Sequence, residues 1–207
     1  PASRDHTCGK RWPSVSAKLE SKGFEVVTHM TNSVGHASEI AWELRQQNVE
    51  GPIVAVGGDG TVHEVASALR GSDIPLGILP FGSGNDYAIT QGISRKNVDK
   101  AIDVLRNGVD RRCAAWRLEG FPASATGDYP APKQNQWDGK ATQDGKVVRW
   151  VFLESDSGIT SAMSRSKLSR AKWIKGKKTY TYLGITTIPF WKRRKVWLKL
   201  DDSEGKI

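Results

Sequence analysis

The chain has 207 residues, of which 38% are hydrophobic and 26% charged, and its formal net charge at pH 7 is +9. This length allows one large domain or two small ones, and the hydrophobic content is adequate for a packed core. The only cysteines, Cys8 and Cys113, lie far apart, which argues against a disulfide scaffold or a cysteine metal site and favours a reducing compartment. No apolar run approaches the ~20 residues that span a bilayer, and no signal-peptide pattern opens the chain, so we expect a cytoplasmic protein.

Hydrophobic spacing in the first 50 residues predicts two helices and a strand. The spacing is helical over residues 12–22 and again over residues 37–47. Between them, residues 24–27 alternate in the manner of a half-buried strand. The order of these elements is typical of an α/β domain.

Residues 53–65 read Ile-Val-Ala-Val-Gly-Gly-Asp-Gly-Thr-Val-His-Glu-Val, and the rest of the chain is organised around them. The four apolar residues predict a buried parallel strand, and Gly57 and Gly58 permit a sharp turn after it. Thr61 is then predicted to open a helix as its N-cap, with Glu64 completing a capping box. Unpaired N–H groups and the helix dipole would make this turn a phosphate site rather than an ordinary tight turn.

The glycine turn matches neither of the two commonest nucleotide fingerprints. It lacks the Gly-Lys-Ser/Thr of a P-loop, and it is not a G-x-G-x-x-G dinucleotide turn. An aspartate beside a phosphate is repulsive unless a cation lies between them. Asp59 therefore indicates a Mg²⁺-nucleotide, contacted directly or through water.

A second glycine turn follows the next predicted strand. Residues 74–79 form that strand, residues 81–86 form the turn, and a short helix comes after it. Because ligands of open α/β folds bind at the carboxyl ends of the strands, we expect the two glycine turns to meet there. A last amphipathic helix is predicted over residues 98–105.

Two motifs resemble those of a known family. Residues 57–61, Gly-Gly-Asp-Gly-Thr, resemble the signature of the diacylglycerol kinase, sphingosine kinase and NAD kinase superfamily. Residues 75–88, PLGILPFGSGNDYA, closely resemble the lipid-kinase segment PLGILPxGTGNDFA, where NAD kinases differ. The chain thus resembles the diacylglycerol kinase catalytic domain family. The resemblance implies a Rossmann-like α/β domain with a mainly parallel sheet, a β-sandwich second domain, and an active site between them.

The resemblance also implies particular site residues, with ATP and Mg²⁺ as cofactors. Asp59 is the expected catalytic residue and the contact to Mg²⁺. The expected nucleotide-binding residues are Thr31, Gly57, Gly58, Asp59, Gly60, Thr61, Val62, His63 and Ser83, and the expected supporting residues are Glu64, Gly82, Gly84, Asn85 and Asp86. Thr31 could equally be an ordinary loop residue, His63 could merely cap the turn, and Asn85 and Asp86 could merely cap the short helix.

Beyond residue 109 the sequence predicts strands without long helices between them. They are expected over residues 112–118, 146–153 and 195–200, with a long exposed loop or insertion at about residues 120–145 and a helix within residues 161–182. We therefore expect a nucleotide-binding domain at residues 1–110 and the start of a lipid-substrate domain at residues 111–207.

The resemblance places the family's first strand before residue 1 and its general base beyond residue 207. By itself the chain is thus expected to be inactive, with its general base unknown. Glu154 and Asp156 lie two apart on a predicted strand and would face the same side, either as a wall of the site or as solvent-facing charges. Glu154 replaces the family's usual Asn, and Ile159-Thr160 replace its Phe-Asp, which leaves the choice of substrate open.

The positive charge is concentrated near the end of the chain. Residues 157–200 contain twelve Lys and Arg residues, between 165 and 199, and no acidic residue. Such a stretch fits nucleic acid, phospholipid headgroups or simply a solvated basic face. With the resemblance, we expect a peripheral anionic membrane surface and no nucleic acid as partner, and oligomerisation stays open.

The expected activity is ATP-dependent transfer of the γ-phosphoryl group to the hydroxyl of a diacylglycerol- or sphingoid-like lipid. One alternative is phosphorylation of a soluble substrate in the manner of NAD kinases. The other is a non-catalytic, nucleotide-dependent protein that binds lipid or nucleic acid.

Overall fold

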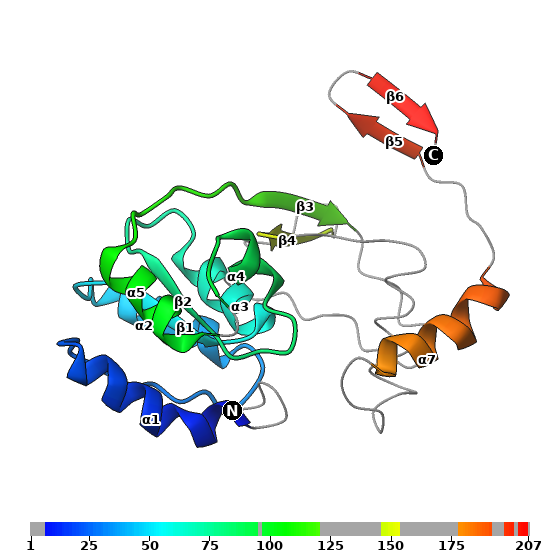
Figure 1. Cartoon of the computed structure of the whole chain (residues 1–207). Coiled ribbons are helices and arrows are strands. Elements are labelled where there is room, and N and C mark those ends of the chain that lie inside the picture. The colour runs from blue at the N-terminus through cyan, green and yellow to red at the C-terminus, as the bar shows by residue number, and fades with distance from the viewer. Residues whose placement is uncertain are drawn as a thin grey trace. The chain divides into compact units, whose positions relative to one another are not determined.

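A computed structural model describes residues 7–94, 97–120, 146–153, 178–191, 197–200 and 203–206 (Figure 1). The chain forms two compact units, residues 1–153 and residues 154–207. The elements of the first unit are α1 (Thr7–Ser21), α2 (His36–Gln46), β1 (Ile53–Gly57), α3 (Asp59–Leu69), β2 (Leu76–Pro80), α4 (Asp86–Thr90), α5 (Val98–Asn107), β3 (Trp116–Gly120) and β4 (Val147–Val151). Those of the second unit are α7 (Lys178–Thr187), the 3₁₀-helix η1 (Ile188–Phe190), β5 (Trp197–Leu200) and β6 (Ser203–Lys206).

The first unit contains a small parallel sheet flanked by helices, as the sequence predicted. β1 pairs with β2, with Ala55 opposite Ile78 and Gly57 opposite Pro80. Helix α3 connects the two strands and packs on both, α2 packs on α3, and α5 packs on β2. Both strands therefore end at the same edge, and each leads directly into one of the glycine turns.

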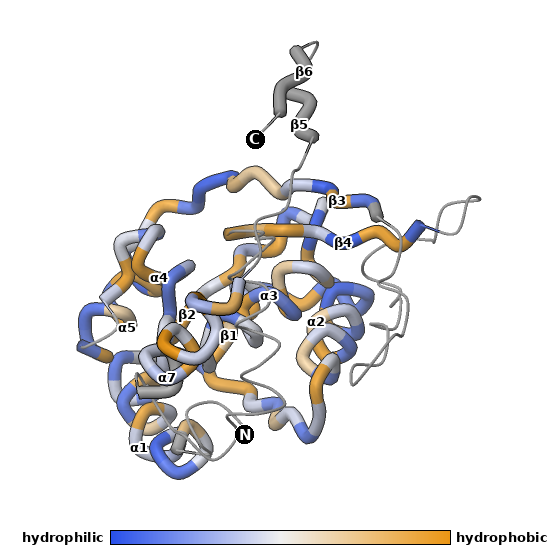
Figure 2. Tube along the Cα trace, turned by 90° about the vertical axis from the view of Figure 1, so that its right-hand side faces the viewer, coloured by the Kyte–Doolittle hydropathy of each residue, from blue (hydrophilic) through white to orange (hydrophobic). Residues whose placement is uncertain are grey.

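The core of this unit lies between the strands and their helices. Ala55, Leu79 and Ile102 are almost wholly buried in it. Figure 2 shows hydrophobic and hydrophilic positions interspersed along α1 and α2, as expected for helices that cover a core on one side and face water on the other.

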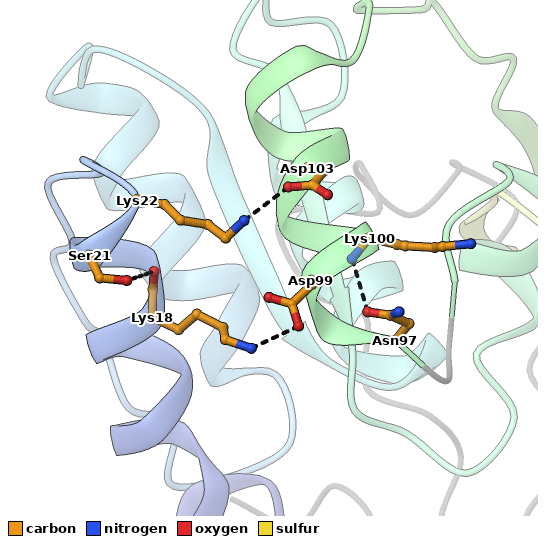
Figure 3. Close-up of polar contacts among 7 residues, drawn as sticks. All are labelled: Lys18, Ser21, Lys22, Asn97, Asp99, Lys100 and Asp103. Atoms are coloured by element: carbon orange, nitrogen blue, oxygen red, sulfur yellow. Dashed lines mark hydrogen bonds and ion pairs between the residues drawn. The ribbon is translucent and has the colours of Figure 1, made fainter.

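Two ion pairs join α1 to α5 (Figure 3). The ammonium group of Lys18 lies 2.8 Å from Asp99, and that of Lys22 lies 3.1 Å from Asp103. The hydrogen bond from Lys18 is the main reason why the pKa of Asp99 is lowered. Because these side chains are one-third to one-half exposed to water, the pairs add little stability, and they mainly fix how the two helices lie along each other.

Several predicted boundaries were wrong. The first helix begins at Thr7 rather than at residue 12, and the second strand runs over Leu76–Pro80 rather than residues 74–79. Residues 24–27, which were predicted to form a strand, alternate between half-buried and exposed side chains, and Val27 is 75% exposed. Among the described residues, however, this segment pairs with no strand. Alternation alone does not make a strand, because a strand needs a neighbour to accept its backbone hydrogen bonds.

The later strands form two ribbons. β3 pairs with β4 in antiparallel fashion, with Leu118 opposite Arg149, and β5 pairs with β6 in the same way. β3, β4 and β5 overlap the strands predicted over residues 112–118, 146–153 and 195–200, although β3 begins at Trp116 rather than at residue 112. The predicted β-sandwich is not confirmed. The predicted insertion at residues 120–145 lies almost wholly outside the described residues, and of the helix predicted within residues 161–182 only the start of α7 is described. The domain boundary at residues 110–111 stays a prediction.

No helix in the described part of the chain has both the length and the apolar character needed to cross a membrane.

Candidate nucleotide-binding site

The two glycine turns lie in contact at the carboxyl edge of the sheet. The carbonyl oxygen of Gly57 accepts the N–H groups of Phe81, at 2.8 Å, and Gly82, at 3.1 Å. A Cβ atom added to Gly82 would lie 2.4 Å from the Cα of Gly58, closer than real Cβ atoms come. Only glycine at position 82 lets the backbones approach this closely, and the expectation that the turns meet is confirmed.

Helix α3 begins three residues earlier than the sequence predicted, since its N-cap is Gly58 rather than Thr61. Gly58 is its N-cap, in extended conformation with φ −99° and ψ −172°, and its carbonyl oxygen accepts the N–H of Val62 at 3.1 Å. Thr61 therefore lies within the first turn, and the predicted capping box with Glu64 is wrong. The first N–H groups of the helix, from Asp59 to Thr61, have no acceptor within the helix and lie beside the glycine turn.

Glu64 caps a different helix from the one predicted. Its carboxylate accepts the N–H of Gly35 at 3.0 Å and that of Ala37 at 3.2 Å, while its carbonyl oxygen accepts the hydroxyl of Ser38 at 2.9 Å. A negative charge at the start of α2 also interacts favourably with the dipole of that helix. Glu64 thus fixes the loop at residues 31–35, which contains Thr31, against α3.

The carboxylate of Asp59 caps the short helix α4. One oxygen accepts the N–H of Asn85 at 2.8 Å, and the other accepts that of Tyr87 at 3.0 Å. Asp59 is the first residue of α3, so these two bonds hold the second glycine turn against the start of that helix. Each oxygen keeps a second lone pair for a further contact.

Asn85 closes the second glycine turn instead of capping the helix that follows. Its backbone is left-handed, with φ 61° and ψ 40°, a conformation that Asn tolerates better than most residues. Its side-chain oxygen accepts the N–H of Gly82 at 2.7 Å, and its side-chain NH₂ group donates to the carbonyl oxygen of Gly82 at 2.8 Å. The prediction that Asn85 caps α4 with its side chain is therefore wrong, because Asp59 supplies that cap.

Two other predicted residues, Gly84 and Ser83, lie within this turn. A Cβ atom added to Gly84 would lie 3.0 Å from a carboxylate oxygen of Asp86 and 3.2 Å from one of Asp59. The backbone of Gly84 therefore runs between two acidic groups. Ser83 is exposed at the tip of the turn, where a ligand could reach its hydroxyl.

His63 lies on α3 one turn after its start and is exposed. Its ring packs edge to face against Phe152, with 5.7 Å between the ring centroids and 70° between the planes. This contact brings the end of β4 beside α3, within the first unit. Glu154 and Asp156, which follow Phe152, lie outside the described residues.

No sequence pattern predicted that certain other groups lie at this edge of the sheet. The N–H of Tyr87 is a backbone donor, and its role depends on a carboxylate 28 residues away. Burial, with a smaller contribution from the neighbouring Cys113 thiol, raises the pKa of Tyr87 to about 12, so its phenol is neutral at physiological pH. Cys8, at the start of α1, donates its thiol to the carbonyl of Val56 at 3.6 Å.

A separate groove of about 600 Å³ lies at the opposite edge of the sheet, between the end of α2 and the segment that precedes β2. The guanidinium of Arg45, which lines it, donates to the carbonyls of Ala68 and Arg70, at 2.9 Å each. Arg45 therefore joins α2 to the end of α3. Because ligands of open α/β sheets bind at the carboxyl edge, the groove is the weaker candidate despite its size.

No group of three or more metal-ligating side chains occurs among the residues that the structure describes.

A small parallel sheet flanked by helices, with two glycine turns in contact beside the start of α3, defines the class as an α/β protein. The sequence model of the diacylglycerol kinase catalytic domain matches residues 1–117, more than half of the chain. The chain therefore belongs to the diacylglycerol kinase catalytic domain family.

Named relatives agree with this membership. A diacylglycerol kinase of Bacillus subtilis (strain 168) is 39% identical over 124 residues, which are 58% of this chain and 40% of the relative. A probable lipid kinase, YegS-like, of Klebsiella pneumoniae (strain 342) is 46% identical over 116 residues, 54% of this chain and 38% of the relative. A diacylglycerol kinase of Mycobacterium tuberculosis (strain ATCC 25618 / H37Rv) is 26% identical over 164 residues, 79% of this chain and 45% of the relative. The matches span less than half the length of these relatives.

Proposed function

We propose that the full-length protein is an ATP-dependent lipid kinase that transfers a phosphoryl group to the hydroxyl of a diacylglycerol- or sphingoid-like lipid. The observation that carries this proposal is the contact between the two glycine turns. The backbones are so close there that a side chain at position 82 would collide with Gly58. Family membership and the names of the relatives support the same chemistry.

The nucleotide phosphates bind at the start of α3 in this proposal. The N–H groups of Asp59, Gly60 and Thr61 have no acceptor within the helix, and the positive end of the helix dipole favours an anion. A Cβ atom added to Gly60 would meet nothing within 4 Å, so space is open beside this turn. Ser83, on the second turn, and Thr31, on the loop that Glu64 holds, supply hydroxyl groups to the same ligand.

Asp59 has two functions in the proposed site. Its hydrogen bonds to Asn85 and Tyr87 hold the second glycine turn in place, and its spare lone pairs accept water bound to a Mg²⁺ ion. Mg²⁺ usually keeps several water ligands and binds through few carboxylates. Contact through water is therefore the arrangement that this carboxylate fits best.

Bound ATP supplies the phosphoryl group: the lipid oxygen forms a bond to the γ-phosphorus, the bond from that phosphorus to the β–γ bridging oxygen breaks, and ADP leaves. The described residues contribute to this reaction by holding the phosphates in one orientation. Such positioning is a main source of catalysis in phosphoryl transfer. The hydroxyl proton passes to a general base that we place outside the described residues. Loss of such a base typically costs about 10²- to 10⁴-fold in rate.

The full-length protein should be assayed with labelled ATP against diacylglycerol, a sphingoid base and NAD in parallel. The proposal requires label in one of the lipids and none in NAD. Label in NAD alone would indicate the soluble-substrate alternative. ATP binding without transfer to any acceptor would indicate a non-catalytic protein.

We also propose that the basic stretch at residues 165–199 attracts an anionic membrane. Most of it lies outside the described residues, so the proposal depends on sequence charge: twelve cations and no acidic residue between 157 and 200. Each cation near an anionic surface contributes about 1 kcal/mol, less at high salt. Binding to vesicles should therefore rise with anionic lipid, fall with salt, and weaken when Lys175, Lys177, Lys178, Arg193 and Arg194 are changed to Gln. Tighter binding to short nucleic acids than to vesicles would contradict it.

A further inference from the structure

The guanidinium group of Arg11 lies beside the two glycine turns. Its central carbon is 4.8 Å from the centroid of the Phe81 ring. Phe81 directly follows β2, is only 3% exposed, and donates its N–H to the carbonyl of Gly57 at 2.8 Å. Arg11 thus contacts a residue whose backbone is hydrogen-bonded to the first glycine turn, the turn that binds phosphate in the proposed function.

The neighbouring Cys8 independently places the start of α1 at the same edge. Its thiol donates to the carbonyl of Val56, the last residue before Gly57. Burial raises the pKa of this thiol, while the positive charges of the N-terminal amino group and of Arg11, three residues further along α1, act in the opposite direction. Arg11 thus affects the electrostatics of the carboxyl edge although it belongs to a helix far from the glycine motifs in sequence.

The donor groups of Arg11 are open to a ligand. A cation–π contact with an aromatic ring uses none of the N–H groups of the guanidinium as hydrogen-bond donors, so these groups are available to bind an anion in two-point fashion. Among the residues that the structure describes, no carboxylate forms an ion pair with Arg11, whereas Arg112 pairs with Asp73. The structure therefore places the cation of Arg11 on Phe81, at the second glycine turn, without a described acidic partner.

We propose that Arg11 is a binding residue for the polyphosphate of the nucleotide. The first glycine turn has no lysine in the position of a P-loop lysine, so any cationic side chain that contacts the polyphosphate comes from elsewhere in the fold. Arg11 supplies it from α1, and Phe81 fixes its orientation. This inference rests on the proposed function, because it needs a nucleotide at the glycine turns.

The test compares the affinities of the full-length protein for ATP, ADP and adenosine by titration calorimetry, for the parent and three variants. Arg11→Gln removes the charge, Arg11→Lys keeps the charge but not the planar group, and Lys10→Gln is the matched control because Lys10 is adjacent and exposed. Arg11→Gln should lower ATP affinity by about tenfold or more, ADP affinity by less, and adenosine affinity not at all. Arg11→Lys should recover part of the loss, and Lys10→Gln should resemble the parent.

Two results would overturn the inference while leaving the proposed function intact. One is an equal loss for ATP and adenosine in Arg11→Gln, which would indicate a purely structural contact with Phe81. The other is the same ATP affinity in Arg11→Gln and Lys10→Gln, in proteins that still bind ATP. If the parent binds no ATP, the proposed function fails and the inference fails with it.

Discussion

Asp59 Oδ2 accepts the backbone N–H of Asn85 at 2.8 Å, so the first residue of α3 holds the turn that precedes α4. A second bond, from Tyr87 to the other oxygen, completes the cap. The motif aspartate is therefore also a structural residue. Its replacement should lower stability as well as activity, in contrast to a loop carboxylate that contacts only a ligand.

The first prediction concerns Asp59→Asn. The amide keeps one acceptor oxygen but turns an NH₂ group toward a backbone N–H, so one hydrogen bond is lost and the free energy of unfolding should fall by about 1–3 kcal/mol. Lipid phosphorylation should be abolished in the proposed kinase. Urea unfolding and turnover of the full-length protein measure the two effects, with Asp73→Asn as a control, since the Asp73 side chain is 91% exposed. Unchanged turnover in Asp59→Asn would show that Asp59 has no catalytic role.

The second prediction concerns Glu64→Ala. The N–H groups of Gly35 and Ala37 lose their shared acceptor, so the start of α2 should fray and the protein should be destabilised by about 2–3 kcal/mol. Hydrogen exchange should show lost protection at these two amides, with little change in β1. Glu43→Gln, at an exposed position on α2, is the matched control. Retained protection in Glu64→Ala would mean that the carboxylate does not hold this loop in solution.

Stability should depend on pH through Tyr87. Its pKa is about 12 in the folded protein, mainly because of burial, and 10.0 ordinarily. The folded state therefore holds the phenol proton more tightly than the unfolded chain does, and the stability contribution is complete below pH 10 and is lost as the pH rises toward 12. Tyr87→Phe lacks this proton, so its urea stability should decline less across that window than that of the parent. Parallel declines would contradict the assignment.

The strand–turn–helix order and the meeting of the glycine turns could be predicted from the sequence, since both follow from local patterns and a general property of parallel sheets. β1, α2 and α5 lie within a residue or two of their predicted bounds. Each of these elements carries its own hydrophobic periodicity, which needs no information from distant residues.

The errors at the site have a common physical cause. Glu64 fits a capping box within its own helix, but its carboxylate binds N–H groups 27 and 29 residues earlier. Asn85 fits a helix cap, but Asp59, 26 residues away, takes that role. In both cases the sequence offers a partner nearby in the chain, but the hydrogen bond forms with a partner that is distant in the chain. The packing of α3 against its neighbours determines which of the two partners lies within reach.

Amide NMR of the full-length protein during titration with Mg²⁺-ATP tests most directly where the nucleotide binds. The largest shifts are predicted at the start of α3, for Gly60 and Thr61, and in the second turn, for Gly82 and Ser83, with much smaller shifts from adenosine alone. Largest shifts instead at Arg45 and Ser72, which line the groove at the opposite edge of the sheet, would contradict the proposed site.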